Sequence, residues 1–208
     1  MTVKLVGSTS GSVSLQAPAS TSGGAHRVLT LPDANATLAT TSDSFGKVLQ
    51  VVQTTKTDTA SNSTASGGSW TPTTPKCSIT PSNASNKILI QATIPLAIAQ
   101  DQHNIYLTVL KDGSPMSFIG DANGNMTRST VGTFNYNNYR FQSVHYNYLD
   151  TAGGTSAIEY SLKLTHDSGS TTTIYLNRTE ATDNSDDRHR GAANICLLYT
   201  SPSPRDRG

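Results

Sequence analysis

Apolar and polar residues alternate along most of the chain from Lys47 onward. The clearest stretch runs from Lys87 to Ala99, where every second residue is apolar: Ile88, Ile90, Ala92, Ile94, Leu96 and Ile98. A period of two is the spacing of side chains on one face of a β-strand, so the pattern predicts a strand with one buried face. The Asp112-Gly113 dipeptide after the next alternating stretch is a hairpin-turn signal.

The same pattern predicts a set of strands separated by Gly, Asn and Asp turns: 48–53, 76–80, 87–99, 105–109, 114–119, 140–149, 157–165, 172–176 and 192–195. We expect the strands 157–165 and 172–176 to form a hairpin through the turn at Asp167–Gly169. Eight or nine strands of this kind predict an all-β fold, a β-sandwich (jelly-roll-like) head.

Residues 1–45 have a different pattern. Alternation is confined to short pieces, such as Val3 with Leu5 and Val13 with Leu15, between loops of Ser, Thr and Gly. So little apolar surface does not offset an ordering entropy of ~1–2 kcal/mol per residue. We therefore predict a short extended β stalk segment over 1–45, which stays flexible or shares a core with identical chains, and a head domain over 46–195.

Composition narrows the function. Charged residues make up 14% of the 208-residue chain, and 15 Lys and Arg against 14 Asp and Glu give a net charge of +1. Such a balance argues against nucleic-acid binding through phosphates. We see no apolar run of the ~20 residues that span a membrane and no signal peptide after Met1, so membrane insertion is not expected. For Cys77 a buried free thiol is the simpler interpretation, although a bridge to Cys196 stays open.

The C-terminal run Cys196–Asp206 is similar to the in-frame translation of a sequencing adapter, as found at the ends of metagenomic assemblies. We expect the authentic sequence to stop near Ile195 and residues 196–208 to derive from the adapter. A last strand completed by foreign residues should weaken the sheet, although Leu197 and Leu198 partly replace the missing apolar side chains.

Catalytic and metal-binding patterns are weak. No two histidines have the spacing of a metal pair, and no Gly-x-Ser-x-Gly motif occurs. Asp121–Asn125 has oxygen ligands at alternate positions but lacks the later Glu of a calcium loop, and turn chemistry explains it better. A second acidic cluster, Asp183–Asp187, is best interpreted as a solvated loop. We predict a non-enzymatic protein with no metal and no cofactor.

Aromatic residues give the candidate binding site. Tyr136 and Tyr139 are interleaved with Asn137 and Asn138, a combination that suits contact with a receptor or glycan because rings stack while amides hydrogen-bond. A plain surface loop explains the same four residues without a ligand, and both interpretations stay open. Nearby Tyr146 and Tyr148 are expected to pack inside the sandwich, and the single Trp to anchor a core edge.

Two stretches resemble tail-fibre proteins of marine tailed phages. Residues 7–18, 29–33 and 36–40 resemble their repeat-like N-terminal part. Residues 46–53, 79–82 and 85–89 resemble the start of the domain that often follows, and 174–178 with the Asp/Asn-rich loop before Ala192 resembles that domain's closing hairpin. The resemblance implies a homotrimeric virion appendage whose β-rich head meets a host cell-surface glycan or protein, alongside other virion proteins. Two alternatives stay open: a bacterial surface adhesin or carbohydrate-binding module, and a structural capsid or fibre decoration without a ligand.

Overall fold

The computed structural model describes residues 2–6, 12–16, 48–99, 102–137, 139–181 and 188–200. The chain divides into two compact units, Met1–Ser42 and Asp43–Gly208. In the first unit, β1 (Thr2–Val6) and β2 (Ser12–Gln16) form an antiparallel pair with Leu5 opposite Val13. The remainder of the predicted stalk segment (1, 7–11 and 17–45) lies outside the described residues.

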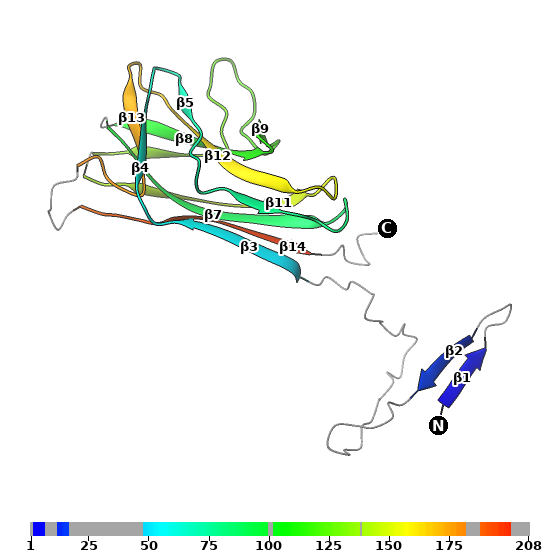
Figure 1. The fold of residues 1–208 in the computed structure, drawn as a ribbon. Helices are drawn as coiled ribbons and strands as arrows, with labels where there is room; N and C mark the ends of the chain where they lie inside the picture. Colours follow the sequence, from blue (N-terminus) through cyan, green and yellow to red (C-terminus); the bar gives the residue numbers. More distant parts are fainter. Residues whose placement is uncertain are drawn as a thin grey trace. The chain divides into compact units, whose positions relative to one another are not determined.

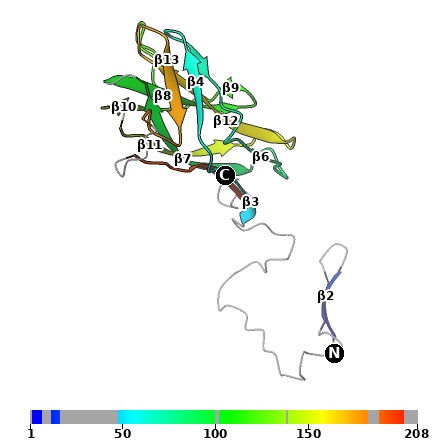
Figure 2. The same cartoon turned by 60° about the vertical axis from the view of Figure 1, so that its left-hand side comes forward.

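The second unit consists of two antiparallel sheets (Figures 1 and 2). The first sheet contains β3 (Val48–Lys56), β4 (Ala60–Thr64), β7 (Lys87–Ile98), β11 (Gln142–Thr151), β13 (Thr172–Leu176) and β14 (Ala193–Thr200). The second contains β5 (Ser69–Trp70), β6 (Cys77–Ile79), β8 (His103–Lys111), β9 (Ser114–Pro115), β10 (Val131–Asn135) and β12 (Ile158–His166). No described segment forms a helix that could span a membrane.

The strand order defines a jelly roll. On one edge of β7, β14 pairs with residues 87–93 and β13 with 96–98, so β13 and β14 act as one interrupted strand. Their outer neighbours β3 and β4 form a second interrupted strand, and β5 with β6 a third. Counted in chain order, the eight resulting strands are arranged 1-8-3-6 in one sheet and 2-7-4-5 in the other. The predicted β-sandwich of jelly-roll type is confirmed.

The core lies between the sheets and is almost entirely aliphatic. The predicted inward face of the 87–99 stretch is buried, and so are Tyr160, Leu162 and Leu164 on β12. Phe118 stacks on Tyr148 at a centroid distance of 3.7 Å, beside the buried Tyr146. Cys77 is a buried free thiol, and Cys196 is also free, so the two cysteines form no bridge.

The predicted hairpin of 157–165 with 172–176 is wrong. β12 and β13 belong to different sheets, because both edges of β12 are already paired, one with β8 and the other with β5 and β6. The turn at Asp167–Gly169 therefore crosses from one sheet to the other. Three strands were not predicted (β4, β5 and β10), and of the predicted strand 114–119 only Ser114–Pro115 forms.

The last strand continues past Ile195 to Thr200. Leu197 and Tyr199 are buried, and the strand stays paired with β3 and β7 throughout, with one irregularity between Tyr199 and Thr200. The first five residues of the adapter-like run therefore keep the inward–outward alternation, and 201–208 lie outside the described residues.

A buried asparagine joins four segments where these interrupted strands meet. Asn177 follows β13 with a left-handed backbone (φ 64°), and its N–H donates to the Pro95 carbonyl at 3.1 Å. Its side-chain Nδ2 donates to the carbonyls of Lys56 and Asp58 at 2.8 and 2.9 Å, and its own carbonyl accepts from Gly191 N at 3.0 Å. One residue thus connects β7, the β3–β4 connection and the segment that leads into β14.

Replacing Asn177 should destabilise the sandwich through two separable effects. In Asn177→Ala the carbonyls of Lys56 and Asp58 lose their donor, and Ala must hold a left-handed backbone that Asn tolerates better, so we expect a loss of about 2–4 kcal/mol in unfolding free energy. Asn177→Gly removes only the side-chain bonds and should be less destabilising by about 1 kcal/mol. Urea unfolding at fixed protein concentration measures both, with exposed Asn62→Ala as the control. Equal midpoints for Asn177→Ala and the control would contradict the assignment.

Candidate receptor-contact site

The loop between β10 and β11 starts from a buried anchor. Asn135, the last residue of β10, donates from Nδ2 to the Ile98 carbonyl at 3.2 Å and accepts a bond from Gln102 N at its own carbonyl, at 2.8 Å. The first bond joins the start of the loop to the end of β7, and the second joins it to the residue just before β8. The loop that follows Asn135 therefore projects from the sandwich at an anchored position.

A short polar turn then exposes the two predicted tyrosines. The Asn137 side-chain oxygen accepts from Tyr139 N at 3.1 Å, an Asx-type turn that folds the loop back toward β11. Tyr136 is 72% exposed and Tyr139 is 45% exposed. Asn137 is half-buried, and Asn138 lies outside the described residues. The structure thus brings Tyr136, Asn137 and Tyr139 together on one exposed turn.

Other aromatic and basic residues surround this turn. The Arg188 guanidinium lies over the Tyr139 ring at 4.1 Å, and Phe134 meets Tyr136 edge to face at 5.9 Å. Phe141 and His189 form a second edge-to-face pair at 6.1 Å. The rings and the guanidinium of Arg188 give a surface that can stack on a ligand and hydrogen-bond to it.

A shallow cleft of about 280 Å³ adjoins the turn, lined by Arg140, Phe141, Gln142 and His189. Its wall requires a glycine, because a Cβ at Gly191 would lie 2.7 Å from Pro95 Cγ and 3.2 Å from Phe141 Cζ. The close approach of Gly191 brings the segment 188–190 against the loop. Sequence reasoning missed Phe134, Phe141, Arg188 and His189, since only the tertiary fold brings them to the tyrosines.

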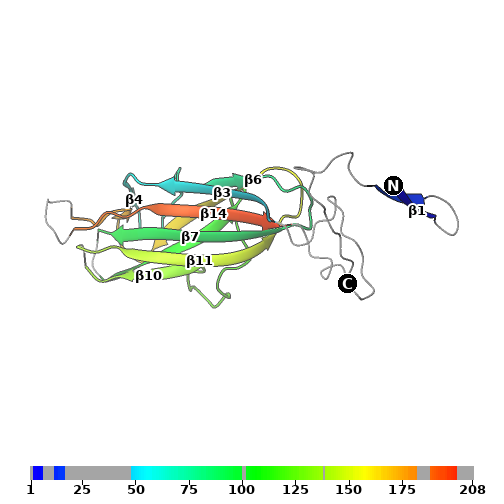
Figure 3. The same cartoon turned by 90° about the horizontal axis from the view of Figure 1, so that it is seen from below.

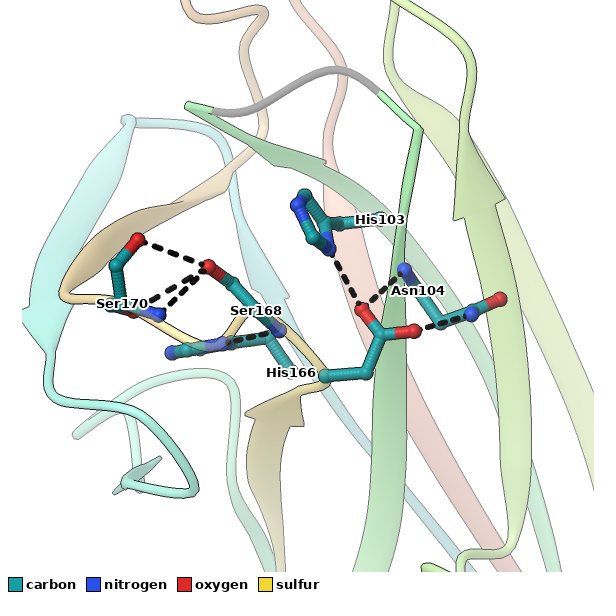
Figure 4. Close-up of polar contacts among 6 residues, drawn as sticks. His103, Asn104, His166, Ser168 and Ser170 are labelled. Carbon is teal, nitrogen blue, oxygen red and sulfur yellow. Dashed lines mark hydrogen bonds and ion pairs between the residues drawn. The ribbon is translucent and has the colours of Figure 1, made fainter.

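A second polar cluster, at the β12–β13 crossing, contains histidine, aspartate and serine (Figure 4). The Asp167 carboxylate accepts hydrogen bonds from His103 Nδ1 at 3.0 Å, from the backbone N of Asn104 at 2.9 Å and from the side-chain Nδ2 of Asn104. Burial opposes ionisation of Asp167, but the bonds from Asn104 and His103 outweigh it and lower its pKa below the usual 3.8.

Further hydrogen bonds within this cluster join β12 to β4 and order the turn that follows β12. His166 is buried, and its two ring nitrogens meet the Thr64 hydroxyl at 2.9 Å and Ser168 N at 3.1 Å. The Ser168 hydroxyl bonds with the carbonyl and the hydroxyl of Ser170, both at 3.3 Å. The cluster holds the crossing between sheets in place.

In the described part of the chain, no three His, Cys, Asp or Glu side chains gather in a way that could hold a metal ion. In the loop 121–125, the Asp121 carboxylate accepts from Ala122 N, which is turn geometry. The cluster Asp183–Asp187 lies outside the described residues.

No family model and no curated protein matches this chain. Among solved structures, it is similar to the T=1 particles derived from infectious bursal virus, with 13% identity over 96% of this chain and 48% of that one and a TM-score of 0.40. A VP2 subviral particle of infectious bursal disease virus gives 11% identity over 86% of this chain and 47% of the other, with a TM-score of 0.38. The chain spans about half the length of these structures.

The Asp167 cluster should make stability acid-sensitive. A carboxyl whose pKa is lower in the folded state contributes stability above its unfolded pKa, and that contribution is lost as pH falls through the folded value. We therefore expect Asp167→Asn to unfold more easily than wild type at pH 7, by about 1–2 kcal/mol. The difference should shrink as pH falls below 3.8.

Urea midpoints measured between pH 7 and pH 2 check this expectation, with Asp121→Asn as a control on an exposed loop. A constant difference between wild type and Asp167→Asn across the whole range would show that the Asp167 charge does not contribute.

Proposed function

We propose that this chain is a non-enzymatic structural protein of a phage virion, a tail fibre whose β-sandwich takes part in attachment to the host surface. The observation that carries the proposal is that the chain enters the sandwich at one end and the aromatic turn lies at the other. The chain enters at Val48, beside the Lys87 end of β7, whereas Asn135 and the aromatic turn are fixed to Ile98 at the other end. Twelve residues of β7 separate these ends by roughly 40 Å.

This arrangement suits an appendage. The end of the sandwich at which the chain enters would face the particle, and the turn with Tyr136 and Tyr139 would face outward. The resemblance of 7–18 and 46–53 to phage tail fibres supports the same interpretation. We propose assembly as a homotrimer, together with other virion proteins, because the N-terminal β1–β2 pair is too small to be stable by itself.

The mechanism would be adhesion through many weak contacts. Tyr136 and Tyr139 would stack on a host glycan or a protein side chain, while Asn137 and Arg188 supply hydrogen bonds. Three copies per fibre and several fibres per particle would turn a weak single contact into firm attachment.

The same turn also fits a second candidate, a bacterial adhesin or carbohydrate-binding module. Exposed rings beside amides serve glycan binding in a monomer equally well. The two candidates differ in assembly state, since only the tail fibre requires a trimer.

Removing both rings should abolish most binding without affecting the fold. We expect Tyr136→Ala/Tyr139→Ala in the full chain to bind arrayed bacterial surface glycans and whole bacterial cells about tenfold or more weakly, because each stacked ring contributes ~0.5–1.5 kcal/mol beyond its buried area. Fluorescently labelled protein measures this, and Met126→Ala, at a 70% exposed side chain on another loop, is the control. Binding that stays at the wild-type level would favour a decoration protein.

A further inference from the structure

An aliphatic row crosses the outer face of the first sheet. Val51 on β3 lies opposite Leu198 on β14, Leu198 lies opposite Leu89 on β7, and Leu89 lies opposite Leu149 on β11. Directly opposite residues of antiparallel strands share a face, so these four side chains, here called the aliphatic row, form a continuous line across four strands.

The row faces outward; Val51 and Leu149 at its ends are exposed, and Leu89 and Leu198 between them are half-buried. Val51 is 56% and Leu149 is 58% exposed, and the exposed Leu49 extends the row along β3. Figure 3 looks onto this face, where β3, β14, β7 and β11 lie side by side with no described segment drawn across them. Single exposed aliphatic residues are ordinary on protein surfaces, but a contiguous line marks an interaction site.

The face around the row lacks charge. The next line across the same strands consists of Gln53, Cys196, Gln91 and Asn147, and the line after it of Thr55, Asn194, Thr93 and His145. Twelve positions in three lines thus hold no Asp, Glu, Lys or Arg, in a chain of which 14% of the residues are charged. The first formal charge beside the row is Lys87, whose Nζ donates to Thr151 Oγ1 at 2.8 Å.

An identical copy is the occupant that fits this face. Without charges the face offers no complementarity to an acidic or basic partner, and it creates no like-charge repulsion between two copies of itself. The row also lies at the end of the sheet where the chain enters at Val48, so copies associated through their N-terminal units would meet at this end.

Size supports a tethered contact. The four side chains of the row together with Leu49 bury less than the ~800 Å² per partner of a standard stable interface, so the row alone would associate weakly. Linkage through an N-terminal unit raises the effective concentration to about the millimolar range, where a weak contact becomes occupied.

We propose that the aliphatic row is the surface through which the sandwiches of neighbouring copies contact one another. This inference rests on the proposed homotrimer, in which the rows of three copies meet around the axis. Of its four residues only Leu198 belongs to the adapter-like run, while Val51, Leu89 and Leu149 lie outside it.

The test uses the full chain and its Val51→Lys/Leu149→Lys variant, with Met126→Lys as a control that places a lysine at an equally exposed apolar position elsewhere. Light scattering and sedimentation across a dilution series measure the mass and the dissociation constant. We expect a wild-type trimer, an unchanged control, and a dissociation constant raised about a hundredfold or more in the variant, because its lysines would be buried without partners.

Two results would overturn the proposal in distinguishable ways. A trimeric wild type with the same dissociation constant in the variant refutes the row and leaves the proposed trimer intact. A wild type that is monomeric at every concentration refutes the trimer and, with it, the contact between copies. If the lysine variant fails to fold, Val51→Thr/Leu149→Thr replaces it: its smaller, uncharged, strand-compatible side chains should still weaken assembly about tenfold.

Discussion

The hydrogen bonds of Asn177 hold together the place where the first and last strands of the jelly roll are both interrupted. The break between β3 and β4 lies beside the break between β13 and β14, because β4 pairs with β13 and β3 pairs with β14. A sheet interrupted in two adjacent strands would leave unpaired carbonyls in its interior, which is costly. Asn177 supplies donors to two of them and accepts the returning chain through Gly191. The segment between β13 and β14 carries Arg188 and His189 to the aromatic turn, so the candidate site depends on this junction.

Polar networks fix both ends of β8, while the core between them is aliphatic. At its start, His103 and Asn104 bind Asp167 and secure the crossing between sheets. At its end, Lys111 and Tyr160 both donate to Asp150 of the opposite sheet, at 2.7 and 2.6 Å. Lys111 also donates to the carbonyls of Thr151 and Ala152, so this partly buried charge pair has the additional bonds that make its burial tolerable. Burial, followed by the bond to Asp150, raises the pKa of Tyr160 and keeps it a donor.

The sequence predicts the strands whose inward face is continuously apolar. It does not predict strands with few apolar residues, which form because a neighbouring strand offers an edge for hydrogen bonding. The stretches around β7 and β12 alternate without a break because both face the core. By contrast, β4 reads Ala-Ser-Asn-Ser-Thr and β10 Val-Gly-Thr-Phe-Asn, and these strands form because β13 and β8 offer edges to pair with. The predicted hairpin failed for a related reason, since a turn signal does not reveal whether the next strand's edge is already occupied. At the candidate site, the clustering of Tyr136 and Tyr139 is visible in the sequence. Arg188 is about fifty residues away from them in the chain, so its place over Tyr139 is a product of the tertiary fold.

The two exposed surfaces lie at different places along the same sheet. Leu149 of the aliphatic row and Gln142, where the aromatic loop joins β11, are seven residues apart, which is roughly 23 Å along a strand. Contact between copies near the entry of the chain would therefore leave the aromatic turns uncovered. The low charge of the chain would suit both proposed surfaces: identical copies would approach without repulsion, and the rings of Tyr136 and Tyr139 would meet a neutral ligand without first displacing tightly bound counterions. The long strands of the jelly roll separate the end at which the chain enters from the loops at the opposite end. The core that both ends share keeps the two proposed surfaces in a fixed relation.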